Sequence, residues 1–450
     1  MNKHQDRLKG WKRGIRPSLA AVLTLGLPAS GSFAQTTVPS SAAPSEPPFT
    51  LERALALGGA VSPSLAAGTA GVQAAAAGRR VAALRPNPEI VVGTENVAGS
   101  GEYRGLRSAE TTAGLALPIE LGGKRSARVA VADAQIDRAR IGAAIAIADL
   151  TLSITQSYIE AAAAERRLIV AREQAGLAAE GARAARVRVT AGAASPIEQQ
   201  RAEVLRINAE TAVERAARTA EVSRANLARL IGQPVTGPLD TAWFDRIGGY
   251  GPTQPIAAEG TLALAAANAD ARTASAQVRL ARAQRIPDVT VSASARRLEA
   301  TNDLAAVFGV SVPFPVFNNG RAAIAQAQAQ ATQAEALRRV ALLEAERSIA
   351  SAQAELANAA TTARTAGGPA LVAAAEAARI ARIGYAAGKF SQLDLLEAER
   401  TLRETRATAI DALAAYRDAE ARLARLTAPA TLSAEQTPPR AGSTLPGDIR

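Results

Sequence analysis

Two segments of the sequence place carboxylates at matching positions behind a glycine and a serine. They are VTAGAASPIEQQRAE (189–203) and YAAGKFSQLDLLEAE (385–399), which align at a shift of 196 residues. A serine followed three residues later by a carboxylate is typical of a helix N-terminus, where both side chains accept hydrogen bonds from free backbone N–H groups. The alignment pairs Gly192 with Gly388, Ser195 with Ser391, and Glu198 with Asp394. Helix capping and compensation of the helix dipole are therefore the first explanation of these carboxylates.

The sequence offers few other groups for chemistry. It contains no cysteine, and its single histidine and single methionine are His4 and Met1. The stretch GGKRS (122–126) has some likeness to a phosphate-binding loop, but Pro118 stands where such a loop needs its first glycine. We therefore expect neither an enzyme nor a bound cofactor or resident metal ion.

Long helices are expected to carry the two glycine turns. From Lys124 to about Arg188 the sequence contains no proline and few glycines, and a helix of that length spans roughly 95 Å. Positions spaced alternately by three and four residues are uncharged, which is typical of a coiled-coil seam. They are 147, 150, 154, 157, 161, 164, 168, 171, 175 and 178, and the run from Arg321 behaves likewise at 342, 345, 349, 352, 356, 359 and 363. A plain amphipathic helix on a globular protein would not need this length.

Strand patterns precede each long helix. Residues 285–297 alternate between apolar and polar side chains, and 85–97 are also expected to be extended. A second strand follows each of these, with Ala113, Leu115 and Leu117 alternating in one and Phe308, Val310 and Val312 in the other. The segments around these strands repeat at a shift of 195, which aligns Pro118 with Pro313. Because proline cannot donate to a ladder, we expect each second strand to end at its proline.

The chain is therefore predicted to hold two similar units. Each consists of a helix, two strands, a long helix, a turn and a returning helix, and the returning helices are expected at 196–231 and 392–426. The expected boundaries are a linker at 35–49, a first repeat at 50–231, an inter-repeat segment at 232–258, a second repeat at 259–427 and a flexible tail at 428–450. The inter-repeat segment contains Trp243 and is expected to pack on the outside of the helices.

The first 34 residues are typical of a secretory signal peptide. Six basic residues precede a short apolar stretch, Ser18–Leu27, and Ser32-Phe33-Ala34 forms a cleavage site of small residues. The alternative, a single membrane anchor, would need an apolar run of about 20 residues. Cleavage would leave 416 residues with a net charge of about +6, a weak argument for a nucleic-acid partner. Without cysteine the chain cannot carry a lipoprotein-type lipid.

The predicted strands suit a membrane barrel. Strands of about 9–10 residues match the ~9–11 residues of a tilted membrane strand. Only a closed barrel spans a bilayer without unpaired backbone groups, and four strands do not close, whereas three chains would supply twelve. After residue 34 no apolar run approaches 18 residues, which argues against a helical membrane protein.

Several motifs in this order resemble the TolC family of outer-membrane efflux channels. They are FTLERALALG and SPSL (49–65), LRPNPEI (84–90), LPIELGGKR (117–125), LARLIGQP (227–234), VPFPVFNNGR (312–321) and GKFSQLDLLEAERTL (388–402). The likeness covers about 380 residues. The pairing of RPNPE with ELGGKR is most similar to the outer-membrane component of cobalt–zinc–cadmium-type cation efflux systems.

This resemblance implies a mainly α-helical fold with a membrane β-barrel. The expected assembly is a homotrimer with a twelve-stranded barrel in contact with outer-membrane lipid and a long helical barrel in the periplasm. It implies a passive, gated conduit that docks onto a periplasmic adaptor and an inner-membrane RND-type pump. By this resemblance the adaptor-docking candidates are Gly192, Ala193, Ser195, Gly388, Lys389 and Ser391, and the pore-gate candidates are Glu198, Asp394 and Glu397.

The sequence leaves two alternative functions open, and it departs from the pattern of a membrane barrel in one feature. The same channel fold serves export of organic drugs and type I secretion, and a periplasmic coiled-coil adaptor or structural protein would also explain the seams and the signal peptide. The barrel segments contain few aromatic residues, Tyr103 and Phe308 with Phe314 and Phe317 just beyond. The aromatic girdle expected of a barrel is therefore thin.

Overall fold

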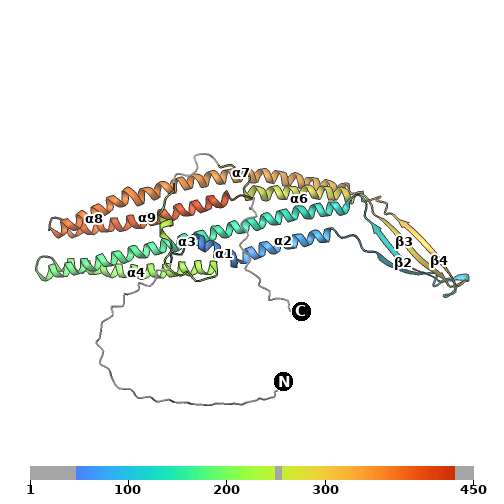
Figure 1. Cartoon of the computed structure of the whole chain (residues 1–450), viewed down its shortest axis with the longest axis horizontal. Coiled ribbons are helices and arrows are strands. Elements are labelled where there is room, and N and C mark those ends of the chain that lie inside the picture. The colour runs from blue at the N-terminus through green and yellow to red at the C-terminus, as the bar shows by residue number, and fades with distance from the viewer. Residues whose placement is uncertain (1–46, 249–255, 431–450) are drawn as a thin grey trace, which may run out of the picture. The chain divides into compact units, whose positions relative to one another are not determined.

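The computed structural model describes residues 47–248 and 256–430, and most of this part is helical (Figure 1). The predicted signal peptide (1–34), nearly all of the linker and the tail from residue 431 lie outside the described residues. The helices are α1 (Leu51–Val61), α2 (Pro63–Ala82), α3 (Lys124–Thr190), α4 (Pro196–Ile231), α5 (Thr241–Asp245), α6 (Leu262–Gln284), α7 (Arg321–Thr365), α8 (Leu371–Ala386) and α9 (Gln392–Leu426).

Helix α3 is the central element of the bundle. It is 67 residues long and packs against α2, α4, α6 and α9. The predicted seam is confirmed along most of its length, because every one of the ten positions except Ile147 is buried or half-buried. The seven seam positions of α7 are likewise buried or half-buried. Many seam residues are alanines, so the helices approach closely and each buried side chain covers little area.

The second long helix differs from the first because it is interrupted. A π-helical turn, Ala366–Ala370, separates α7 from α8, and within it Gly368 leaves helical geometry with φ −103° and ψ −107°. Pro369 lies inside this turn, and a proline in a helix interior lacks its N–H and clashes with the preceding turn. A helix as continuous as α3 was expected from Arg321 to the second glycine turn. This expectation is wrong, because the helix is interrupted after Thr365.

The inter-repeat segment contributes to the core as well as covering the helices. Phe244 of α5 is buried together with Phe49 and Tyr158. The Tyr158 hydroxyl donates to the carbonyl of Phe49 at 2.7 Å and accepts a hydrogen bond from the amide of Asp240 at 3.0 Å. Its ring meets that of Trp243 edge to face, with centroids 5.6 Å apart. The guanidinium of Arg417, from α9, stacks over the Trp243 ring, 4.5 Å from the ring centroid.

The four strands form one antiparallel sheet in the order β1-β2-β3-β4. They are β1 (Glu89–Glu95), β2 (Glu110–Ile119), β3 (Val289–Leu298) and β4 (Asp303–Ser311). The central pairing, β2 with β3, joins segments from the two halves of the chain. Three strands have the expected length, whereas β1 has only seven residues.

One of the two expected strand ends is wrong by a residue. Pro118 lies inside β2, opposite Thr290, and the strand continues to Ile119. Because the pairing with β1 stops at Ala116, β2 has a neighbour on only one side there, the kind of position where a sheet tolerates proline. Strand β4 ends at Ser311, two residues ahead of Pro313.

The sheet has one mainly apolar face and one of mostly small and polar residues. The register places Ile90, Val92, Leu115, Leu117, Ile119, Val289, Val291, Phe308 and Val310 on the first face. The second face carries Glu95, Glu110, Thr112, Ser292, Ser294 and Arg296. On it, Arg296 donates to Glu110 at 2.8 Å and to Thr112 at 3.0 Å.

Among the described residues, none of the helices taken singly has the length and apolar character needed to cross a membrane. Only α1 and α2 taken together meet that criterion, and they are bent by 49° between Val61 and Pro63.

Candidate functional site

The two glycine turns have the same backbone geometry. In the first turn the amides of residues 191, 192 and 193 donate to the carbonyls of residues 187, 189 and 188, and the second turn repeats these three bonds 196 residues later. Gly192 and Gly388 both adopt a positive φ, 70° and 71°, a conformation that glycine reaches without strain. Each turn therefore requires its glycine.

All six docking candidates, Gly192, Ala193, Ser195, Gly388, Lys389 and Ser391, are exposed.

The two predicted helix caps differ. Ser391 and Asp394 form a full capping box, in which the Ser391 hydroxyl accepts from the Asp394 amide and the Asp394 carboxylate accepts from the Ser391 amide at 2.9 Å. The Ser391 hydroxyl also donates to the Asp394 carboxylate, at 2.7 Å. The hydrogen bonds that the carboxylate accepts from the Ser391 hydroxyl and amide lower the pKa of Asp394. At the start of α4 the Ser195 side chain makes no capping bond. Ser195 occupies the N-cap position as expected, but the capping bond expected from its side chain is absent, and the Glu198 amide donates to the carbonyl of Ser195 instead.

Glu198 takes part in a contact between the two turns. The Tyr385 hydroxyl donates to the Glu198 carboxylate at 3.3 Å, and the Gln392 side-chain amide donates to the Glu198 carbonyl at 3.1 Å. The Arg188 guanidinium lies over the Tyr385 ring, 4.7 Å from its centroid. We call these four residues the tip contact. It joins α3 and α4 of the first half to α8 and α9 of the second, whose turns lie at the same end of the bundle in Figure 1.

Electrostatics keep Tyr385 a hydrogen-bond donor. Burial raises the pKa of Tyr385, and the neighbouring Glu198 charge adds to this, while Arg188 opposes it. The phenol is therefore protonated at neutral pH and donates to Glu198. Glu198 could be singled out from the sequence, whereas Arg188, Tyr385 and Gln392 were not predicted as its partners. Of these, Tyr385 stands at the first position of the repeated turn segment, where an aromatic residue was a visible signal.

The three gate candidates occupy different environments. Glu198 belongs to the tip contact, and Asp394 caps α9. Glu397 is exposed one turn further along α9. The structure therefore assigns a contact between helix pairs to Glu198 and a local structural role to Asp394.

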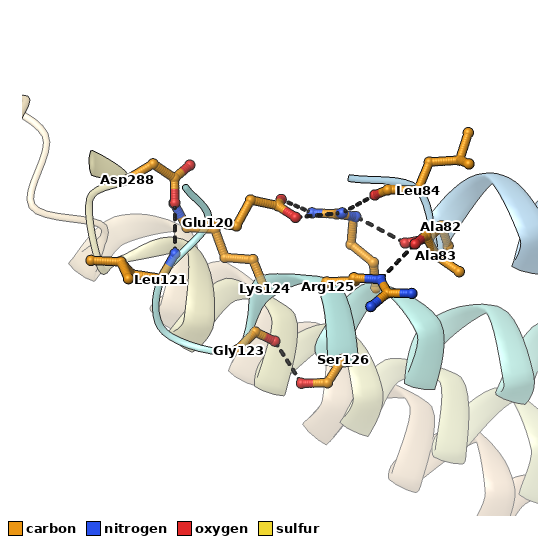
Figure 2. Close-up of polar contacts among 11 residues, drawn as sticks. Ala82, Ala83, Leu84, Glu120, Leu121, Gly123, Lys124, Arg125, Ser126 and Asp288 are labelled. Carbon is orange, nitrogen blue, oxygen red and sulfur yellow. Dashed lines mark hydrogen bonds and ion pairs between the residues drawn. The ribbon is translucent and has the colours of Figure 1, made fainter. Parts of the chain in front are cut away.

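A second polar cluster lies where strands join helices (Figure 2). Arg128 forms a two-pronged pair with Glu120, with one N–O distance of 3.0 Å. It also donates to the carbonyl of Leu84 at 3.1 Å. Arg125 donates to the carbonyl of Ala83 at 2.5 Å. Arg128 also donates to the carbonyl of Ala82, the last residue of α2, at 3.3 Å. The two arginines thus satisfy carbonyls at and just beyond the end of α2, which lack helical partners, and they oppose the negative end of the helix dipole. The hydrogen bond from Arg128 lowers the pKa of Glu120.

The same cluster fastens the start of β3. The carboxylate of Asp288 accepts from Lys124 at 2.7 Å and from the amide of Leu121 at 3.1 Å. Burial opposes ionisation of Asp288, but these two hydrogen bonds outweigh it and lower its pKa. Gly122 and Gly123, both at positive φ, make the bend between β2 and α3. The GGKRS stretch thus builds a strand–helix junction and no phosphate loop.

Long paired helices joined to a four-stranded antiparallel sheet with one apolar face define a mainly helical protein. The family model described as "Outer membrane efflux protein" matches residues 59–233 and 255–428. The chain therefore belongs to the outer membrane efflux protein family. The expected resemblance is confirmed, and the chain is an outer-membrane efflux channel and not an enzyme.

Curated relatives come from metal-resistance systems. The chain is 30% identical over 371 residues to the cobalt-zinc-cadmium resistance protein CzcC of Cupriavidus metallidurans, covering 80% of this chain and 85% of that protein. It is 35% identical over 292 residues to the nickel and cobalt resistance protein CnrC of the same organism, covering 64% of this chain and 69% of that protein.

Solved structures share the fold. A membrane protein from Pseudomonas aeruginosa aligns with a TM-score of 0.69 at 22% identity, covering 84% of this chain and 90% of that one. The outer membrane protein VceC of Vibrio cholerae aligns with a TM-score of 0.68 at 20% identity, covering 84% and 96%.

Proposed function

We propose that this chain is the outer-membrane conduit of a tripartite efflux system that exports heavy-metal cations. The observation that carries this proposal is the similarity to CzcC over 80% of the chain. The names of three relatives specify resistance to cobalt, zinc and cadmium, to nickel and cobalt, and to nickel, cobalt and cadmium. A periplasmic adaptor and an inner-membrane RND-type pump would supply the energy, and this chain would provide the path across the outer membrane.

The working assembly in this proposal is a homotrimer. Strands β1 and β4 each have one unpaired edge in the four-stranded sheet, and such edges need a partner. Pairing β4 of one copy with β1 of the next would close a twelve-stranded barrel. Its apolar face would meet lipid, and the face with Glu110, Thr112 and Arg296 would line the lumen, as membrane barrels require.

Two internal repeats would build each protomer, at 50–231 and 259–427. The matching hydrogen bonds of the two turns support this division. The interruption at Ala366–Ala370 would be a difference that arose in the second repeat only. The helices would then form a periplasmic tunnel with the two turns at its tip.

The tip contact would act as the gate, and the exposed turn residues would meet the adaptor. Opening the tunnel requires the α8–α9 pair to move away from the α3–α4 pair. The hydrogen bond from Tyr385 to Glu198 spans these pairs and must break in that movement. Gly192, Ala193, Ser195, Gly388, Lys389 and Ser391 are exposed beside this contact and would be available to an adaptor.

A deletion strain tests the proposed cargo. The strain would be plated on graded cobalt, zinc, cadmium, nickel, copper and silver, and in parallel on dyes and detergents. We expect sensitivity to one or more metals, restored by the intact gene. Sensitivity to dyes and detergents alone would replace the metal cargo with organic compounds, and loss of a secreted protein alone would favour type I secretion.

A further inference from the structure

The long helices of the two halves differ at matching positions. The shift of 196 residues that aligns the two turns places the π-helical turn Ala366–Ala370, which we call the break, opposite residues 170–174. Those residues lie within the uninterrupted helix α3. The break contains Gly367, Gly368 and Pro369 in succession. Sharp changes of helix direction occur at prolines, at glycines and at π-helical turns, and such turns are frequent at functional sites.

Close packing does not explain the two glycines of the break. A Cβ atom added to Gly367 or Gly368 would meet nothing from a neighbouring helix within 4 Å. Gly368 instead leaves helical dihedral angles, with φ −103° and ψ −107°, and Pro369 has no N–H to bond the preceding turn. A few residues of this kind absorb the dihedral changes of hinge motions.

Between the break and the turns, the buried apolar side chains form two separate clusters, each within one helix pair. They are Ala182, Ala185 and Ala202 between α3 and α4, and Ala374, Ala378 and Leu402 between α8 and α9. Polar contacts join the two pairs in this region, including the tip contact and the ion pair of Arg406 with Glu173 at 3.2 Å. Exposed ion pairs contribute little, so the pairs can separate there without disrupting a shared apolar core.

At the level of the break, by contrast, the helices share a packed core. Ile410 of α9 belongs to the buried cluster that contains Ile154 and Tyr158 of α3. Ala366, in the break itself, is buried in a cluster with Ala409 of α9. The break therefore lies at the boundary between this packed core and the two separate helix pairs.

The α8–α9 pair can move as one body about this boundary. The ion pair of Arg382 with Glu399 and the cluster around Leu402 hold α8 to α9. Helix α8 is 16 residues long, roughly 24 Å, so a rotation of about 10° at the break would displace its turn by roughly 4 Å. A displacement of this size breaks the hydrogen bond from Tyr385 to Glu198. Helix α9 has no break and would follow by a gentle curve, as long helices commonly do.

We propose that Gly367, Gly368 and Pro369 form the hinge on which the α8–α9 pair swings away from the α3–α4 pair when the tunnel opens. The α3–α4 pair stays in place, because its long helix has no break. The tip contact and the ion pair of Arg406 with Glu173 then separate together, and the apolar clusters stay intact. This inference rests on the proposed function, because it assigns the hinge to the movement that opens the tunnel.

Spin labels at matching residues of the two turns test the hinge. The chain contains no cysteine, so Ala191→Cys or Ala387→Cys provides one labelling site in each copy. Both residues are exposed helix C-caps with φ −80° and ψ 0°. The full-length protein would be reconstituted into lipid vesicles, and double electron–electron resonance would measure the distances between labels on different copies. Tyr385→Phe, which removes the hydrogen bond to Glu198, should add a population of longer distances for the label at 387 and none for the label at 191.

Restoring a regular helix should remove that longer population. Gly368→Ala combined with Pro369→Ala replaces two helix-breaking residues with the best helix former and should return the label at 387 to its shorter distance. Gly176→Ala combined with Gly181→Ala is the matched control, because it changes exposed glycines of α3 and should leave the longer population unchanged. Ala370→Gly loosens the same turn and should enlarge that population, which tests the hinge even where the double variant at the break does not assemble.

The failure of the hinge and the failure of the proposed function give different results. A longer population that survives in the double variant at the break, or that Ala370→Gly leaves unchanged, would place the bending elsewhere. Equal lengthening at 191 and 387 would mean that both helix pairs move, and no longer population in Tyr385→Phe would mean that the α8–α9 pair does not swing. Each of these results makes the inference wrong and leaves the proposed channel standing. If neither label reports a distance between copies, the proposed assembly fails, and the inference fails with it.

Discussion

The hydroxyl of Tyr385 donates a hydrogen bond to the carboxylate of Glu198, 3.3 Å away and 187 positions earlier in the chain. This bond connects the α3–α4 pair to the α8–α9 pair at their turns, beside the hydrogen bond from Gln392 to the Glu198 carbonyl. Arg188 stacks on the same ring and donates to the Tyr385 carbonyl at 3.4 Å. One aromatic side chain thus carries both a stacking contact and a hydrogen bond between the halves.

The substitution Tyr385→Phe should weaken the gate and leave the turn intact. It removes the hydrogen bond to Glu198 but keeps the ring on which Arg188 stacks. A lost hydrogen bond of this kind costs about 1 kcal/mol, or roughly a fivefold shift of the closed–open equilibrium. Single-channel currents in planar lipid bilayers should show larger or more frequent openings.

Tyr103→Phe is the matched control, because Tyr103 lies exposed in the segment between β1 and β2. It makes the same chemical change away from the turns and should leave the currents unchanged. Identical currents from Tyr385→Phe and the unsubstituted channel would remove the tip contact from the gating mechanism.

The two serines ahead of α4 and α9 should respond differently to alanine. Ser391→Ala removes a side-chain cap and should destabilise the start of α9 by about 1 kcal/mol. Ser195→Ala removes no such bond and should have a smaller effect on α4. Hydrogen exchange of the amides in the first turn of each helix measures both. Equal acceleration in the two variants would contradict the difference between the caps.

Acid should weaken the α9 cap at a pH below the usual range for aspartate. The hydrogen bonds from Ser391 lower the pKa of Asp394 in the folded protein. The cap is therefore complete above the unfolded value of about 3.9 and is lost as the pH falls through the lower folded value. The exchange experiment repeated across this range should show protection at pH 5 and a loss only in stronger acid.

Local signals explain why the returning helices could be predicted to the residue. Each is bounded by a glycine turn, a serine, and a proline or glutamine at the first helical position, and the observed bounds are 196–231 and 392–426 as expected. The break at Ala366–Ala370 carried its own signal, two glycines and a proline, but the regular apolar spacing before it favoured continuity. The periodic apolar spacing therefore outweighed the two glycines and the proline in the prediction of this helix.

Long-range contacts account for most of what the sequence could not reveal. Glu198 was chosen as a cap or gate residue, but its partner Tyr385 comes from the other half of the chain. The bond between Leu121 and Asp288 spans 167 positions in the same way. Side-chain partners at such separations depend on how the helices and strands are brought together, and no spacing rule within one segment specifies them.

Tyr158 should ionise well above the usual range for a tyrosine. Burial among Phe49, Phe244 and Trp243 raises its pKa to about 12. Because the folded pKa exceeds the unfolded value of about 10, the neutral phenol is favoured by folding. Its stabilising contribution is complete below pH 10 and is lost as the pH approaches 12. Ultraviolet titration of the folded protein should show a late step near pH 12 that Tyr158→Phe removes, and a late step that persists in this variant would assign the shift to another residue.

The junction of Figure 2 should depend on the planar shape of Arg128 and not on its charge alone. The substitution Arg128→Lys keeps the positive charge, but an ammonium cannot hold both oxygens of Glu120 and the carbonyls of Ala82 and Leu84 at once. Loss of these charge-assisted hydrogen bonds should lower the free energy of unfolding by about 2 kcal/mol.

Arg140→Lys provides the matched comparison on the same helix. Arg140 pairs only with Asp137, at 3.4 Å on the exposed surface among the contacts described, and such pairs contribute at most about 1 kcal/mol. Thermal unfolding of the two variants in the same detergent should separate them clearly, with Arg128→Lys melting at the lower temperature. Equal melting temperatures would mean that the charge of residue 128 suffices and that the fork-shaped pairing with Glu120 does not stabilise the junction.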